Sequence, residues 1–339
     1  MYRSDLQNTP KVTVLLPVFN AELFLTECIE SILGQSFSNF ELLAINDGST
    51  DSSREILATY SDPRLVIVDN NDNRGLIYTL NRGISIARGE YIARMDADDI
   101  AVVDRFKKQV AYLDTHPQVA VIGSWAELID HSGKRIQLRQ VPVGNKDIQE
   151  TQLKTNSFIH PSVMFRTDIV RASGSFRQDA LHAEDYDLWL RISENHDVDN
   201  LPEPLILYRV HSGQISQRHL RLQRATADRI RAAAWQRRII SGNLSPDAPS
   251  PIPGWLSRLR GEVGTVGGDY LTWLQLFREM GRENMASQLV YPLLRAAPLN
   301  QQAHSELLRK ILNYILTDNQ IRALRWYKKR LLCLLGNKH

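Results

Sequence analysis

Short apolar runs alternate with segments of helical periodicity through the first half of the chain. The runs at residues 12–18, 40–45, 65–68 and 91–95 are apolar and partly β-branched, as is typical of strands covered on both faces. Between them, residues 21–34 and 76–87 carry apolar side chains at helical spacing. Strands that alternate with helices predict an α/β fold with a mostly parallel sheet and right-handed crossovers.

Polar residues follow each of these predicted strands. They fill residues 17–20, 46–51, 69–75 and 96–99. Strand-to-helix loops are polar in most proteins, so one such loop says little by itself. The carboxyl ends of parallel strands share one edge, where ligands bind, and the joint placement therefore favours a binding crevice.

Three carboxylates, Asp96, Asp98 and Asp99, follow the fourth predicted strand, ahead of a helical pattern that starts at Ile100. Unpaired carboxylates are costly to bury, and a divalent cation that holds a diphosphate would satisfy them with oxygen ligands. The alternative is an acidic helix cap, which explains one or two of the three residues.

The middle of the chain offers further strands at residues 119–125, 160–165 and from 205 onward. Glu184 and Asp185 fall in the first turn of a predicted helix, where acidic residues also stabilise the helix dipole. His211 follows the last of these strands. By itself it is compatible with an ordinary surface histidine.

Composition narrows the class of protein. The 339 residues are 43% hydrophobic and 23% charged, as in a globular protein. No apolar run approaches the roughly 18 residues of a membrane span, and the first residues lack the apolar core of a signal peptide, so a cytoplasmic location is expected. Cys28 and Cys333 are too few for a disulfide framework or a zinc site.

The domain boundaries follow from the same patterns. We expect a main domain at residues 1–216, a basic helix at 217–242, a Pro- and Gly-rich linker at 243–268 and a helical region at 269–339. The last twenty residues mix basic, leucine and aromatic side chains, as in peripheral membrane contacts. A packed terminal helix with a solvated basic face is the alternative.

The ordered motifs PVFN, NDGSTD, NRG and LNRGISIARGEYIARMDADD closely resemble the nucleotide-sugar-binding half of family 2 glycosyltransferases. The resemblance spans residues 11–125 and continues more sparsely to 216. It implies the GT-A fold, with a nucleotide-binding sheet flanked by helices, and an inverting transfer from a nucleotide diphosphate sugar, with a UDP-linked donor favoured. The acceptor would be a glycan or lipid-linked hydroxyl in surface polysaccharide biosynthesis.

The same resemblance implies roles for single residues. It places Pro17, Phe19 and Asn20 beside the uridine, and it gives Asp98 and His211 to a Mg²⁺ or Mn²⁺ ion. The other donor-binding residues would be Asp47 at the uracil or ribose, Arg74, Asp96 near the ribose or diphosphate, Asp99 facing the sugar, and Arg209 offsetting pyrophosphate charge.

For catalysis, the resemblance makes Asp185 the general base and Glu184 a neighbour that binds the acceptor. It also suggests Trp189 as a platform under a sugar.

Other classes of protein fit the sequence less well. A non-catalytic protein that binds nucleotide sugars or an anionic partner is the alternative, although such a protein needs no base. Nucleic acid is not an expected partner, because the motifs of RNA-binding sheets are missing. No GxGxxG follows the first predicted strand, which counts against a dinucleotide-binding domain. Processive synthases carry a QxxRW motif with spanning helices, whereas Gln320 precedes Arg325 and Trp326 at another spacing.

Overall fold

The computed structural model describes residues 9–211 and 220–243. The chain forms two compact units, residues 1–218 with 234–246 and residues 219–233 with 247–339. Of the second unit, only part of one helix is described. The predicted linker at 243–268, the helical region at 269–339 and its basic end lie outside the described residues, apart from residue 243.

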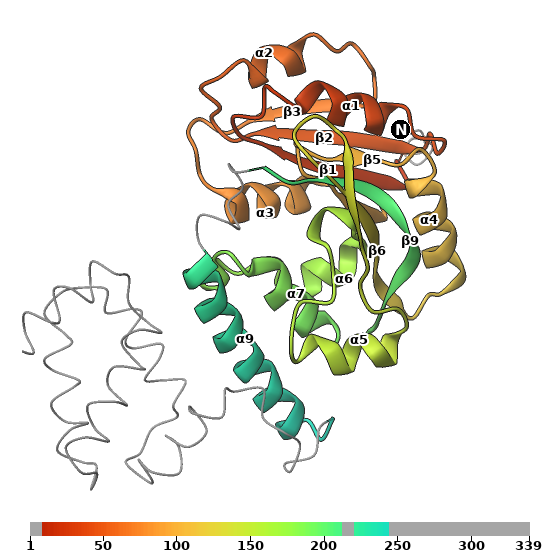
Figure 1. Cartoon of the computed structure of the whole chain (residues 1–339), viewed down its shortest axis with the longest axis vertical. Coiled ribbons are helices and arrows are strands. Elements are labelled where there is room, and N and C mark those ends of the chain that lie inside the picture. The colour runs from red at the N-terminus through yellow and green to blue at the C-terminus, as the bar shows by residue number, and fades with distance from the viewer. Residues whose placement is uncertain (1–8, 212–219, 244–339) are drawn as a thin grey trace, which may run out of the picture. The chain divides into compact units, whose positions relative to one another are not determined.

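Four parallel strands form the first half of the sheet in the first unit, in the order β3-β2-β1-β4 (Figure 1). They are β1 (Val12–Val18), β2 (Phe40–Asn46), β3 (Leu65–Asp69) and β4 (Tyr91–Arg94). The helices between them are α1 (Leu25–Leu33), α2 (Ser53–Ala58) and α3 (Leu76–Ile86). The predicted alternation is therefore confirmed, with boundaries that move by a few residues.

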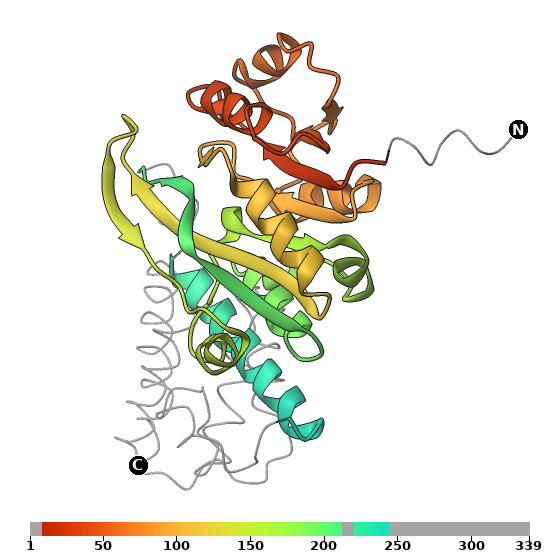
Figure 2. The same cartoon turned by 90° about the vertical axis from the view of Figure 1, so that its right-hand side faces the viewer.

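The second half of the sheet contains both orientations. β8 (Met164–Arg166) lies antiparallel between β4 and β6 (Val119–Ile129), and β9 (Asp197–Arg209) runs parallel to β6 (Figure 2). β7 (Arg135–Arg139) forms a hairpin with β6. The nine-stranded sheet is thus mixed, and the predicted parallel arrangement holds for its first half.

Two apolar layers cover the two faces of this sheet. Alternate residues of β1, such as Val14 and Leu16, join one core cluster with α1 and with α4 (Arg105–Thr115). Leu15 points the other way, into a cluster with α3. That second cluster also holds α5 (Asn145–Gln152), α6 (Thr167–Ala172) and α7 (Glu184–Ile192). The strands are apolar throughout because both of their faces are buried.

Two predicted elements are wrong. Residues Ile100–Ala101 form the short strand β5, which pairs antiparallel with β9, and the helix begins only at Arg105. The segment 160–165 begins with a 3₁₀ turn, His160–Ser162, before β8. Local periodicity cannot reveal β5, because its partner β9 is distant in the sequence.

The basic helix predicted at 217–242 is present as α9 (Leu220–Ile240). Within the described ranges, no helix combines the length and the apolar character that crossing a membrane requires.

Candidate active site

Three carboxylates meet in the loop after β4. One carboxylate oxygen from each of Asp96, Asp98 and Asp99 lies within 4.8 Å of the other two. Burial and the neighbouring charge of Asp98 hold the pKa of Asp99 well above its usual range, and burial and Asp96 raise the pKa of Asp98. In the described part of the chain, the buried Oδ2 of Asp99 finds no hydrogen-bond partner. This set of oxygens fits a hard divalent cation.

The segment after β9 brings a histidine nitrogen to the same loop. His211 Nε2 lies 3.0 Å from Asp98 Oδ2, and the backbone N–H of Arg209 donates to Asp99 Oδ1 at 2.8 Å. The pairing of β5 with β9 brings these two segments together. The structure therefore unites Asp98 and His211, the two residues predicted to bind a metal.

The side chain of Arg209 is fully buried and braces this junction. Its guanidinium donates to the backbone oxygens of Asp98, Asp130 and His131 and to the carboxylate of Glu27, the last at 2.6 Å. It also lies over the ring of Phe24 at 4.4 Å. The contact predicted between Arg209 and a pyrophosphate stays a prediction. Phe24 and Glu27 carry no motif that would have identified them from the sequence.

Asp47, at the end of β2, organises the loop between β3 and α3. Its carboxylate accepts hydrogen bonds from the Asn70 amide at 2.6 Å and from the backbone N–H groups of Arg74 and Gly75 at 3.0 and 2.9 Å. Gly75 has a φ of 85°, which suits glycine at this turn. The half-exposed side chain of Arg74 lies over the Tyr78 ring at 4.6 Å.

The loop after β1 is tied to the loop after β2. Asn20 accepts a hydrogen bond from the Thr50 backbone at 2.8 Å, and its own N–H donates to Ser49 Oγ at 3.1 Å. The ring of Phe19 is 45% exposed, so it can serve as a stacking surface. With Pro17 near the end of β1, these residues lie at the carboxyl edge of the sheet, as the sequence predicted.

A second acidic group begins α7. Burial, and then the charge of Asp185, raises the pKa of Glu184 to about 7. Burial also raises the pKa of Asp185, whose Oδ2 accepts a hydrogen bond from the Asn156 amide at 2.7 Å. Among the described residues, the buried Oε2 of Glu184 has no hydrogen-bond partner. Such a pair can take up a proton near neutral pH.

Trp189 cannot be the predicted platform under a sugar. Its side chain is 0% exposed. The ring packs against Phe158 and Phe165 at centroid distances of 5.9 and 5.7 Å. The helical pattern of α7 does not say which of its faces meets the core, and Trp189 lies on the buried one.

Glu184 should make the stability of the protein depend on pH. Its pKa rises from 4.5 to about 7 on folding, so its contribution is fully present below pH 4.5 and is lost as the pH rises through 7. We expect the free energy of unfolding of Glu184→Gln to gain on that of the wild type over this window, by on the order of 3 kcal/mol. Urea unfolding at a series of pH values measures it. Glu30→Gln, on the exposed face of α1, is the control, and parallel pH profiles for Glu184→Gln and the wild type would contradict the burial effect.

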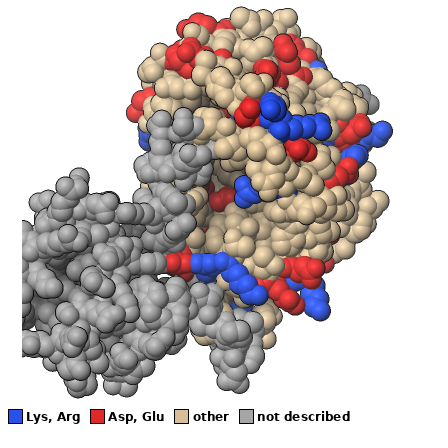
Figure 3. Space-filling view, viewed as in Figure 1, with Lys and Arg blue, Asp and Glu red and all other residues tan. Residues whose placement is uncertain are grey.

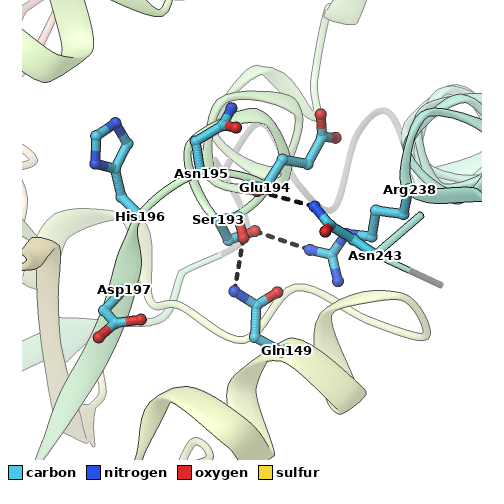
Figure 4. Close-up of a pocket in the computed structure, with 8 residues that line it drawn as sticks. All are labelled: Gln149, Ser193, Glu194, Asn195, His196, Asp197, Arg238 and Asn243. Atoms are coloured by element: carbon cyan, nitrogen blue, oxygen red, sulfur yellow. Dashed lines mark hydrogen bonds between the residues drawn. The ribbon is translucent and has the colours of Figure 1, made fainter. Parts of the chain in front are cut away.

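A separate pocket of about 360 Å³ lies at the other end of α7 (Figure 4). Its lining is polar, and Arg238 Nη2 donates to Ser193 Oγ there while Gln149 donates to the Ser193 carbonyl oxygen. The residues that line it are Gln149, Ser193, Glu194, Asn195, His196, Asp197, Arg238 and Asn243. None of the predicted site residues belongs to this set, so the pocket is distinct from the acidic site.

The charges around the candidate site are mostly negative or already paired. Figure 3 shows acidic side chains gathered on the part of the first unit that carries α1 and α2. Near the carboxylate cluster, the guanidinium groups of Arg94 and Arg209 already face Asp96 and Glu27. A phosphate-bearing ligand at this edge therefore needs further positive charge, as a divalent cation would supply.

The chain shows clear similarity to known proteins. The model of the family described as Glycosyl transferase family 2 matches residues 13–174. A glycosyltransferase of Haemophilus influenzae without an assigned role is 35% identical over 237 residues, which cover 67% of this chain and 73% of that protein. The amylovoran biosynthesis glycosyltransferase AmsE of Erwinia amylovora is 37% identical over 211 residues, covering 61% of this chain and 79% of AmsE.

Among solved structures, residues 1–349 of TarS from S. aureus in complex with UDP-GlcNAc superpose with a TM-score of 0.55 at 18% identity. The match covers 94% of this chain and 92% of the TarS chain, and it shows that the two share a fold.

Proposed function

The chain belongs to glycosyl transferase family 2, and we propose that it transfers a sugar, with inversion, from a UDP-linked donor to a glycan or lipid-linked hydroxyl in polysaccharide biosynthesis. The observation that carries this proposal is the presence of two acidic groups, Asp96–Asp99 beside His211 and the Glu184–Asp185 pair. The amylovoran role of AmsE supports the pathway class, and the UDP-GlcNAc complex of TarS supports the donor class.

A divalent metal, Mg²⁺ or Mn²⁺, fits the first group. Asp98 and His211 would hold it, with Asp96 and Asp99 close by. When bound, it supplies positive charge that stabilises the diphosphate as it departs.

The second group would accept the proton. In the proposed step, the acceptor oxygen forms a bond to the anomeric carbon while the bond from that carbon to the diphosphate oxygen breaks. The electron pair of the broken bond leaves with the diphosphate, and the hydroxyl proton moves to Asp185. A single displacement of this kind inverts the anomeric centre. Glu184 would bind a second hydroxyl of the acceptor.

The donor would lie along the carboxyl edge of the sheet. We assign Pro17, Phe19 and Asn20 to the uridine, with the exposed Phe19 ring as the stacking surface. Asp47 still has lone pairs for the uracil or ribose, and the Arg74 side chain is half-exposed beside it. The remaining donor contacts are proposed for Asp96, Asp99 and Arg209.

A panel of nucleotide sugars, with and without Mn²⁺ or Mg²⁺, tests the function. Release of the nucleotide diphosphate from one donor, only with metal, is the expected result. Tight binding of a donor without release, also in the presence of candidate acceptors, would instead favour the non-catalytic binding protein.

We also propose peripheral contact with an anionic membrane surface through residues 320–339, on sequence grounds alone. Each basic residue near such a surface contributes about 1 kcal/mol. Replacing Arg322, Arg325, Lys328, Lys329 and Arg330 with Gln should release the protein from anionic vesicles and leave donor hydrolysis in solution unchanged. Co-sedimentation measures the binding, and equal binding by the substituted chain would favour a packing role for this segment.

A further inference from the structure

Arg94 is a buried cation at the centre of the candidate site. It is the last residue of β4 and only 2% exposed, and its guanidinium forms an ion pair with Asp96. Within residues 9–211 and 220–243, its Nε and Nη1 atoms have no hydrogen-bond partner of regular geometry. Burying a guanidinium is costly, and replacing a whole buried ion pair with apolar residues is often neutral or stabilising. The position of this charge therefore calls for a functional reason.

One segment of the chain connects Arg94 to α7, which carries Glu184 and Asp185. The backbone N–H of Arg94 donates to the Val163 carbonyl oxygen at 3.0 Å. Upstream of Val163, the His160 ring packs edge-on to Trp189 of α7, and the Asn156 amide donates to Asp185. Residues 156–163 thus fix the end of β4 against the first turns of α7.

The charge of Arg94 acts on groups in both directions. Its cationic charge is stabilised by Asp96, Asp99 and Asp98, and it opposes the effect of burial on the pKa of Glu184 and of Asp185. The other titratable groups that face it are His160, whose pKa burial and then Arg94 hold well below the usual range, and Arg105 on α4. His160 is therefore neutral, and Arg94 is the cation common to both acidic groups.

We propose that Arg94 is a positioning residue that holds Asp96 in place and, from the end of β4 that residues 156–163 fix against α7, favours the ionised form of the Glu184–Asp185 pair, so that Asp185 can accept the proton of the acceptor. The transfer step in this inference rests on the proposed function. Without the charge of Arg94, the pair binds a proton up to a higher pH. Transfer then slows at neutral pH and recovers as the pH rises.

The pH profile of kcat, at saturating donor, acceptor and metal, tests this role in Arg94→Gln and Arg94→Met. The acid limb of the kcat profile should move to a higher pH by about one unit in both variants. At any pH below the limb, kcat then falls about tenfold. Arg94→Lys, which retains the charge, should return the limb towards that of the wild type. Met fills the buried volume without a charge, so it serves as the second neutral variant if Gln does not fold.

Arg105→Met is the matched control. Arg105 is equally buried and donates to the Arg94 carbonyl oxygen at 2.8 Å, but the charge that leads in opposing the raised pKa of Glu184 is that of Arg94 and not that of Arg105. This variant should lose stability with the acid limb in its original place.

A direct titration gives a readout that needs no activity. In ¹³C-carboxyl spectra, the Glu184 signal is the one missing from Glu184→Gln, and its midpoint should rise in both neutral Arg94 variants and not in Arg94→Lys. The role of the charge would be overturned if neither the Glu184 midpoint nor the acid limb of kcat moved in the neutral variants. It would also be overturned if both moved equally in Arg94→Lys. Absence of transfer in the wild type would instead refute the proposed function, and the titration would still decide the role of Arg94.

Discussion

Asp98→Asn is expected to abolish sugar transfer while the protein stays folded. Asp98 contacts His211 Nε2 at 3.0 Å and shares the loop with two further carboxylates, so it is the proposed metal ligand on which the others converge. Asn has the same size but lacks the charge that attracts a hard cation. The change also relieves repulsion with Asp99, so the melting temperature should hold or rise. Initial rates measure sugar transfer, circular dichroism measures the melting temperature, and a Mn²⁺ titration measures the affinity for metal.

Asp104→Asn is the matched control for this variant. Asp104 comes a few residues after Asp99 and directly before α4. Its carboxylate accepts a hydrogen bond from Ser36 Oγ at 2.6 Å and is not part of the carboxylate cluster. Its loss should leave Mn²⁺ affinity near that of the wild type. Full wild-type activity in excess chelator would refute the metal assignment.

Asp185→Asn should lower the rate of transfer by about 10²–10⁴, the usual contribution of a general base. A hydroxyl must lose its proton as the bond to the anomeric carbon forms, and an amide cannot take that proton. Asp185 lies in the first turn of α7 and accepts a hydrogen bond from the Asn156 amide, whereas the other acidic group follows β4 on the proposed donor side. Affinity for the nucleotide should therefore stay near that of the wild type, which isothermal titration with UDP measures.

Glu184→Gln is the companion variant. If it loses transfer while Asp185→Asn retains it, the base is Glu184, whose pKa of about 7 also suits the task. If both variants lose nucleotide binding, the pair is structural.

The sequence predicted the parts of this molecule that depend on local pattern. The strands around Val14 and Leu43 are apolar on both faces, so the sequence shows that they are buried even though it does not show which elements cover them. The loop carboxylates Asp96, Asp98 and Asp99 follow directly from the end of β4, so their proximity needed no tertiary information.

Other features depend on partners far away in the chain. Ile100 continues a helical pattern, yet it pairs with Leu207, and no local signal encodes that choice. The burial of Trp189 and Arg209 follows from neighbours that belong to other elements. Arg94 reads as a polar residue at the end of a strand, and only the packed structure reveals its burial beside Asp96.

The pairing of β5 with β9 has a consequence for synthesis of the chain. Asp98 and His211 are separated by 113 positions, and the two-residue strand between Asp99 and Val102 meets its partner only at Ile206 and Leu207. A ribosome has therefore released the four parallel strands before the residues that would complete the proposed metal site exist. Closing so long a loop is slow compared with forming the parallel strands that precede it. The nascent chain should form the parallel half of its sheet first and gain the proposed affinity for metal last, so an incomplete chain would be unable to consume donor sugar.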